Sequence, residues 1–195
     1  VQVADQARVL QRNAGDRYIN IAPDTAYQQK ATAPANLPER PLVIGFGPGG
    51  LFAALLLAQM GFKPIVLERG RDVRQRTQDT WALWRHNTLT PESNVQFGEG
   101  GAGLFSDGKL YSQIKDPRFY GRKVMHEFVK AGAPPEILYV NKPHIGTFRL
   151  TGVVAAMRKE IIRLGGDVRF ECKVTDLAIE RGQVTGVMLD NGETL

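Results

Sequence analysis

The chain has 195 residues, of which 43% are hydrophobic and 23% are charged, a composition typical of a globular protein and not of a disordered or fibrous one. Its net charge of +5 is compatible with nucleic acid or anionic surfaces as partners, and its one cysteine, Cys172, excludes an intramolecular disulfide. The longest clear apolar run, residues 51–58, is far shorter than a membrane span, and the start has no signal-peptide pattern. We therefore expect a cytoplasmic protein with no membrane partner.

The two ends of the sequence lead us to expect a piece of a longer protein. The first residue is not Met, and the last seven, "LDNGETL", fall within a strand-and-turn pattern. A short amphipathic helix is predicted over residues 4–13 and a brief strand over 17–22. Three prolines among polar and small residues then indicate a linker over 22–40, so we place a domain boundary between 1–38 and 39–195.

Residues 41–68 have the pattern of a strand, a helix and a second strand. "PLVIGFGPGG" is an apolar run that ends in glycines, and "GGLFAALLLAQMG" is an apolar helix closed by Gly61. "KPIVLE" is a second buried strand. A βαβ unit of this length predicts an α/β fold of the Rossmann type, with parallel strands and a right-handed crossover.

The turn after the first strand carries G-x-G-x-x-G at Gly45, Gly47 and Gly50, and Glu68 ends the second strand. Gly45 allows a positive φ, Gly47 lets a pyrophosphate approach the backbone, and Gly50 lets the helix pack against the sheet. Pro48 is tolerated early in a helix, whose N-terminus favours phosphate. Glu68 can accept hydrogen bonds from both ribose hydroxyls and argues against NADP. Together these features predict a dinucleotide site.

Further elements follow in chain order. Residues 72–85 predict a helix with Val73, Thr77, Trp81 and Trp84 on one side, and Asp116 and Pro117 are typical of the first residues of another. The sequence also predicts a strand over 134–140, a helix over 150–164, and a half-buried strand over 167–174 that continues into a meander with an Asn-Gly turn.

A second glycine-rich stretch, "FGEGGAGLFSDGKL", repeats G-x-G-x-x-G at Gly98, Gly100 and Gly103. No buried strand precedes it and no helical pattern follows it, so it does not predict a second Rossmann site. The spacing to Gly108 and Lys109 resembles a P-loop, but Leu110 stands where a Ser or Thr would bind Mg²⁺. The remaining interpretations are a functional loop that approaches a flat or anionic partner and a purely structural loop.

The arginine-rich run "ERGRDVRQR" has three interpretations. A solvated helix face is favoured over binding to nucleic acid, and contact with a cofactor phosphate is the third. His144 lies in a predicted loop and is a candidate acid–base group, but the sequence assigns no catalytic residue. No His/Cys cluster has the spacing of a metal site.

The residues quoted above carry a family resemblance. "VIGFGPGGLFAALLLAQMGFKPIVLERG" resembles the FAD-binding βαβ unit of glutathione-reductase-type flavoproteins, and "NVQFGEGGAGLFSDGKLYSQIKDP" with "KPHIGTFRL" resembles bacterial NAD- or FAD-utilising dehydrogenases. The resemblance covers the chain from about residue 39. It implies that residues 1–38 end an accessory α+β region and that 39–195 are an FAD-binding Rossmann-like domain, incomplete at its C-terminus.

The resemblance implies FAD as the cofactor, with NAD(P)H as a candidate electron donor and a small molecule of unknown identity as the substrate. Its implied cofactor-binding residues are Gly45, Gly47, Pro48, Gly49, Gly50, Glu68, Arg69, Gly100, Gly101, Lys109 and Val174. Two alternatives stay open: an NAD-binding Rossmann protein without flavin, and a flavin-binding module with an RNA-related role.

Overall fold

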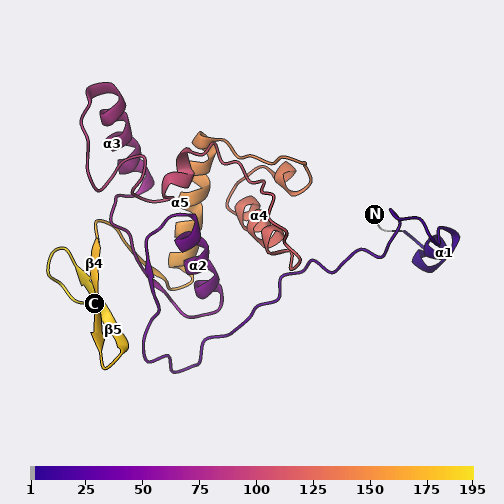
Figure 1. The fold of residues 1–195 in the computed structure, drawn as a ribbon, viewed down its shortest axis with the longest axis horizontal. Helices are drawn as coiled ribbons and strands as arrows, with labels where there is room; N and C mark the ends of the chain where they lie inside the picture. Colours follow the sequence, from indigo (N-terminus) through magenta and orange to yellow (C-terminus); the bar gives the residue numbers. More distant parts are fainter. Residues whose placement is uncertain (1–2) are drawn as a thin grey trace.

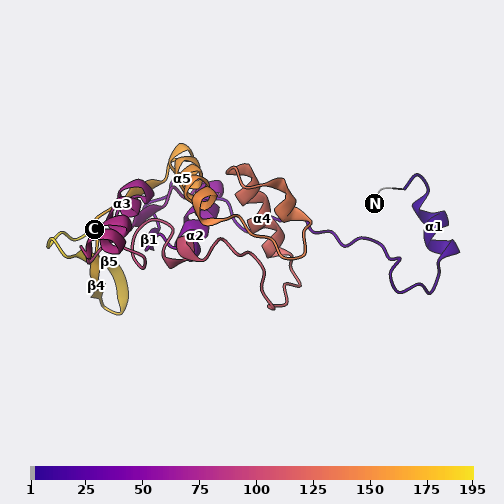
Figure 2. The same ribbon diagram turned by 90° about the horizontal axis from the view of Figure 1, so that it is seen from above.

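The computed structural model describes residues 3–195. Its first element, α1 (Gln6–Arg12), begins after Asp5, whose side chain accepts a hydrogen bond from the Arg8 N–H at 2.9 Å. This helix buries no residue and lies apart from the rest of the chain (Figures 1 and 2). The predicted helix is thus confirmed with shorter bounds. The strand predicted over 17–22 is wrong, because the chain next to α1 stands away from the sheets and has no neighbouring strand to pair with (Figure 1).

A three-stranded parallel sheet forms the centre of the fold. It consists of β1 (Leu42–Ile44), β2 (Ile65–Leu67) and β3 (Asp167–Arg169), in the order β1-β2-β3. The helix α2 (Pro48–Gln59) connects β1 to β2. The long connection from β2 to β3 carries three helices, α3 (Val73–His86), α4 (Tyr120–Lys130) and α5 (Thr147–Arg163), and two short 3-10 helices, η1 (Ala102–Phe105) and η2 (Pro135–Leu138). The predicted α/β, Rossmann-like fold with parallel strands is confirmed.

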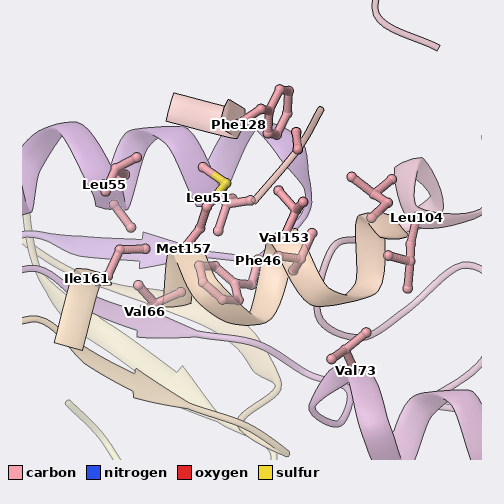
Figure 3. Packing of buried hydrophobic residues seen from close by; sticks show 14 of the residues in the cluster. Phe46, Leu51, Leu55, Val66, Val73, Leu104, Phe128, Val153, Met157 and Ile161 are labelled. Atoms are coloured by element: carbon pink, nitrogen blue, oxygen red, sulfur yellow. The ribbon is translucent and has the colours of Figure 1, made fainter. Parts of the chain in front are cut away.

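The two faces of the sheet are covered by different elements. Val43 and Val66 point to one face, where they pack with α2 and α5 (Thr147–Arg163) in the main core (Figure 3). Leu67 points to the other face and packs against Val187 and Leu189 of a β-hairpin. Successive residues of a strand point to opposite faces of the sheet. Both faces are covered, which explains why β1 and β2 consist of consecutive apolar residues.

The helices α2 and α5 supply half of the buried residues of the main core. α2 buries Leu51, Ala54, Leu55 and Ala58. The helix predicted over 150–164 is confirmed as α5, which begins earlier, at Thr147, and buries the helically spaced residues Leu150, Val153, Val154, Met157 and Ile161. Full burial of one such aliphatic side chain stabilises a fold by roughly 1.5–3 kcal/mol. The packing of α2 against α5 therefore anchors the start of α2, where the first glycine motif lies.

The helix α3 (Val73–His86) has the predicted position but presents a different side to the core. The Asp72 side chain caps it by accepting a hydrogen bond from the Arg74 N–H at 2.8 Å. Trp81 and Trp84, predicted to share one side with Val73 and Thr77, are exposed, and the buried residues are Val73, Arg76, Asp79 and Thr80. The buried side is mostly polar because main-chain carbonyls of residues 94–101 face Arg76 there.

The helix α4 (Tyr120–Lys130) begins later than predicted. Asp116 caps it from outside its first turn, accepting hydrogen bonds from the N–H groups of Tyr120 and Gly121. Phe119, with a φ of 55°, separates the cap from the helix. The segment predicted as a strand over 134–140 is also different: it forms the 3-10 helix η2 (Pro135–Leu138) after Pro134.

The strand predicted over 167–174 is two strands in two sheets. β3 ends at Arg169, Glu171 adopts a φ of 55°, and β4 (Val174–Glu180) begins a hairpin with β5 (Gln183–Leu189). A left-handed residue interrupts strand geometry, so the chain leaves the parallel sheet and crosses to its other face. The predicted meander is confirmed, since Leu195 pairs back with Val187 after Asn191 and Gly192.

Candidate functional site

A cavity of about 340 Å³ lies where the carboxyl ends of β1 and β2 meet the second glycine-rich stretch. We call it the glycine cleft. Six of the predicted cofactor-binding residues line it: Gly45, Gly47, Glu68, Arg69, Gly101 and Val174. These residues come from four separate stretches of the chain. Open α/β sheets bind their ligands at the carboxyl ends of the strands, and the volume is in the range of small-ligand pockets.

The turn between β1 and α2 has the geometry expected of a phosphate-binding turn. Gly45 has a φ of 87°, and its N–H donates to the Leu67 carbonyl at 2.8 Å. Gly47 is the N-cap of α2, and Pro48 is its first residue. A Cβ on Gly50 would lie 1.9 Å from the Gly45 carbonyl oxygen, so only glycine allows α2 to start this close to the turn. The N-cap Gly47 therefore brings the N-terminus of α2 to the cleft, and the first N–H groups of a helix have no partner within the helix.

Glu68 is buried and joins the two glycine-rich stretches. Its Oε2 accepts a hydrogen bond from the Phe46 N–H at 2.7 Å. Its Oε1 accepts from the N–H groups of Gly70 at 2.8 Å and Gly98 at 3.1 Å. An ionised carboxylate has about four acceptor positions, so these three bonds leave one for a further donor. That Glu68 accepts hydrogen bonds from both ribose hydroxyls stays a prediction.

The second glycine-rich stretch packs directly against the first. The Gly100 N–H donates to the Phe46 carbonyl at 2.8 Å. A Cβ on Gly101 would lie 2.8 Å from the Gly47 Cα, closer than real Cβ atoms approach backbone. The two stretches therefore form one surface, and Gly101 brings the second stretch to the edge of the cleft.

A charged rim borders the cleft. Arg69 lies with its guanidinium carbon 3.8 Å from the centre of the Phe97 ring and pairs with Glu92. The Lys173 Nζ lies 2.8 Å from the other oxygen of the same carboxylate. Lys173 and Arg69 hold the pKa of Glu92 below its ordinary value. With two cations to one carboxylate, the rim is net positive, which favours an anionic ligand.

The other predicted residues lie elsewhere. Gly49 is in the first turn of α2, while Pro48, Gly100 and Lys109 line a separate, mostly apolar cavity of about 160 Å³ on the far side of the loop. Lys109 pairs with the exposed His144 across an isolated antiparallel bridge. The role of Lys109 in cofactor binding, and that of His144 as an acid–base group, stay predictions.

The arginine-rich run is not simply a solvated helix face. Arg74 is exposed, and Arg71 pairs with Asp79 and Glu171, but Arg76 is fully buried. Its guanidinium donates hydrogen bonds to main-chain carbonyls of residues 94–101. The favoured interpretation is therefore wrong for Arg76, because a charged group can be buried where enough carbonyl dipoles surround it.

The cleft also includes residues that sequence reasoning missed. Phe97 and Gly98 belong to the second glycine-rich stretch, Gln96 directly precedes it, and Cys172 and Lys173 directly precede Val174. Their position beside predicted residues was the available signal, since a loop that brings one residue to a cleft brings its neighbours too. Burial raises the pKa of the Cys172 thiol, so it is a poor nucleophile at neutral pH.

Two further observations concern residues 3–195. They contain no group of three or more His, Cys, Asp or Glu side chains that could hold a metal ion. No helix in the same part of the chain combines the length and the apolar character that crossing a bilayer requires.

Comparison with known proteins gives one clear sequence relative. No protein-family model matches the chain. A protein of Clostridium beijerinckii, described as uncharacterized, is 52% identical over 156 residues, which are 80% of this chain and 29% of the relative. The chain thus spans less than a third of that relative.

Several solved structures resemble part of the chain. Thermovibrio ammonificans THI4 is 16% identical, with a TM-score of 0.43 over 77% of this chain and 47% of its own. Glycine oxidase from Bacillus cereus is 16% identical, with a TM-score of 0.38 over 78% and 52%. L-amino acid deaminase from Proteus vulgaris is 14% identical, with a TM-score of 0.45 over 84% and 52%. These similarities are too low to indicate the function of this chain.

Proposed function

We propose that this chain is the FAD-binding portion of a flavin-dependent oxidoreductase. The observation that carries the proposal is the glycine cleft itself, where Gly47, Glu68, Gly101 and Val174 meet from four stretches of the chain. Gly47 and Gly101 pack against each other at the N-terminus of α2 and place no side chain in the cleft, as the approach of a pyrophosphate requires. The positive rim around Arg69 suits the same anion.

Each part of the cleft has a role in this proposal. The start of α2 would bind the pyrophosphate through its free N–H groups, and Gly47 would let the phosphates reach the backbone. Glu68 would accept a hydrogen bond from one ribose hydroxyl. Arg69 and Val174 would lie beside the adenosine. FAD, when bound, would supply the chemistry of the reaction, a hydride transfer to or from N5.

The finer assignment is part of the same proposal. We place the chain among bacterial FAD-dependent dehydrogenases related to glutathione-reductase-type flavoproteins, acting in the cytoplasm on a small molecule, without a membrane or nucleic-acid partner. NAD(P)H is the electron donor we consider first. The alternative, an NAD-binding protein without flavin, uses the same turn and the same Glu68, so the two differ in which dinucleotide binds.

The experiment compares Gly47→Ala with the wild type. A Cβ at Gly47 meets only the Gly101 Cα, at 3.7 Å, which is an ordinary contact, so the fold should be kept. The same methyl group stands where a phosphate would approach the backbone. We expect the wild type to bind FAD in a fluorescence titration and Gly47→Ala to bind it at least about tenfold more weakly. The melting temperatures of the two ligand-free proteins should agree.

Gly152→Ala is the matched control. Gly152 lies in α5, away from the glycine cleft, and a Cβ there meets nothing within 4 Å. Its FAD affinity should equal that of the wild type. A wild type that binds NAD but not FAD would replace the proposal by its alternative, and binding of RNA that falls with added salt would favour the RNA-related role.

A further inference from the structure

Arg76 is, with Glu99, one of two charged side chains among the described residues that have no exposed surface, and it lies beneath the second glycine-rich stretch. Its Nε donates to the Asn94 carbonyl and its Nη2 to the Val95 carbonyl, both at 2.8 Å. Its Nη1 lies within hydrogen-bonding distance of three more carbonyls, those of Gly98 at 3.3 Å, Glu99 at 2.7 Å and Gly101 at 2.8 Å. One guanidinium thus forms hydrogen bonds with five main-chain carbonyls of one loop.

The charge of Arg76 has no direct ionic partner. Among residues 3–195, no carboxylate oxygen lies within 4.0 Å of its nitrogens, and the carboxylates of Glu68 and Glu99 act on it from farther away. Burial lowers the pKa of Arg76 to about 10, so the guanidinium is still protonated at neutral pH. The five carbonyl dipoles therefore take the place of water around a buried cation.

One peptide group links the Arg76 guanidinium to the turn beside the cleft. In a trans peptide the C=O and N–H bonds point in opposite directions. The peptide between Glu99 and Gly100 directs its carbonyl to Arg76 and its N–H to the Phe46 carbonyl. That peptide therefore connects the guanidinium on one side with the turn after β1 on the other.

Two glycines of the loop, Gly98 and Gly101, allow its close packing against the Arg76 side chain and against Gly47, respectively. A Cβ on Gly98 would lie 2.6 Å from the Arg76 Cδ, so glycine is needed there for the guanidinium to reach its carbonyls. Gly101, whose carbonyl also accepts from Arg76, is the residue that contacts Gly47 and lines the cleft. Moving the guanidinium would move Gly101 relative to the phosphate-binding turn.

From these contacts we infer that Arg76 is a positioning residue: its guanidinium holds the second glycine-rich stretch at the distance from Gly47 that the dinucleotide requires. The effect on FAD rests on the proposed function, whereas the effect on the loop does not. An ammonium group cannot replace the guanidinium, because one nitrogen with three donors cannot reach carbonyls spread from Asn94 to Gly101.

The test uses Arg76→Lys, which keeps the charge, with Arg74→Lys as the matched control on the exposed side of α3. Hydrogen–deuterium exchange of the ligand-free proteins is measured first. In Arg76→Lys we expect the amides of residues 98–101 to exchange at least about tenfold faster, while those of α2 and α5 keep their wild-type protection. Uniformly faster exchange, or unchanged exchange in the loop, would overturn the inference.

FAD affinity is measured second. We expect Arg76→Lys to weaken FAD binding at least about tenfold and Arg74→Lys to leave it unchanged. In Arg76→Ala, added ethylguanidinium should restore part of the affinity and ethylammonium at equal concentration should not. Wild-type affinity in Arg76→Lys, or equal rescue by both cations, would mean that charge alone matters and that the positioning role is wrong.

Two results separate this inference from the proposed function. If the wild type binds no FAD, the proposed function fails, while the exchange data still decide whether Arg76 holds the loop. If Arg76→Lys does not fold, hydrogen–deuterium exchange of the wild type alone supplies the test. Because Arg76 joins the loop to α3, the amides of residues 98–101 should exchange as slowly as the α3 amides around Arg76. Loop amides that exchange independently of α3 would contradict the inference.

Discussion

Replacement of Gly50 by Ala tests the close approach of α2 to the turn after β1. A Cβ at this position would lie 1.9 Å from the Gly45 carbonyl oxygen and 3.0 Å from the Gly45 carbonyl carbon. Both are backbone atoms of a turn that β2 holds through the Gly45 N–H, so no flexible side chain can move aside. The helix must shift, and α2 carries four buried core residues that would shift with it. Forced overpacking of this kind costs about 1–3 kcal/mol and occasionally more.

Gly49→Ala is the control one residue earlier in the same helical turn. A Cβ on Gly49 meets nothing within 4 Å, and its φ is not in the left-handed region. Ala in place of Gly stabilises such a position by about 0.4–1 kcal/mol. For a chain of 150–250 residues, 1 kcal/mol shifts Tm by about 2–4 °C. By thermal unfolding we expect Gly50→Ala to melt several degrees below the wild type and Gly49→Ala slightly above it. Equal melting temperatures for Gly50→Ala and the wild type would refute the close packing of α2 on the turn.

The remaining predictions concern two buried carboxylates. Glu68→Gln should destabilise the ligand-free protein by about 1–3 kcal/mol, because the amide cannot accept from the N–H groups of Phe46 and Gly98 at once; unchanged urea unfolding would show that Glu68 serves only a ligand. Burial acts to raise the pKa of Glu127, but hydrogen bonds from Lys123 and Lys130 outweigh it and hold that pKa below 4.5. Its ionised form therefore adds stability above pH 4.5 that is lost as pH falls through the lowered pKa. Glu127→Gln should cost more stability at pH 7 than at pH 3, and an equal cost at both would contradict this assignment.

The parts of the fold that the sequence predicted correctly depend on neighbouring residues. The strand–helix–strand unit around Gly45, Gly47 and Gly50 is specified by local apolar runs and by glycines whose spacing follows from one tight turn. The inner face of α5 follows from helical periodicity in the same way. In both cases the information lies within about 30 residues of sequence.

The errors lie where distant contacts decide the structure. Alternation of apolar and polar residues continues through 167–174 without a break, so the pattern gave no sign that Glu171 turns the chain out of the sheet. The burial of Arg76 was equally hidden, because its partners are main-chain carbonyls that every residue has. A sequence shows which side chains carry charge, but not which loop will bring its carbonyls to them.

The second glycine-rich stretch shows why the same pattern can arise from different requirements. In the first motif, Gly50 is needed because the helix starts against the Gly45 carbonyl. In the second stretch, Gly98 is needed for the approach of the Arg76 side chain, and Gly101 for contact with Gly47. Neither position in the second stretch requires a strand before it or a helix after it. Of these two glycines only Gly98 belongs to the G-x-G-x-x-G pattern, and its role is a contact inside the fold. The pattern without a βαβ unit therefore does not by itself indicate a second nucleotide site.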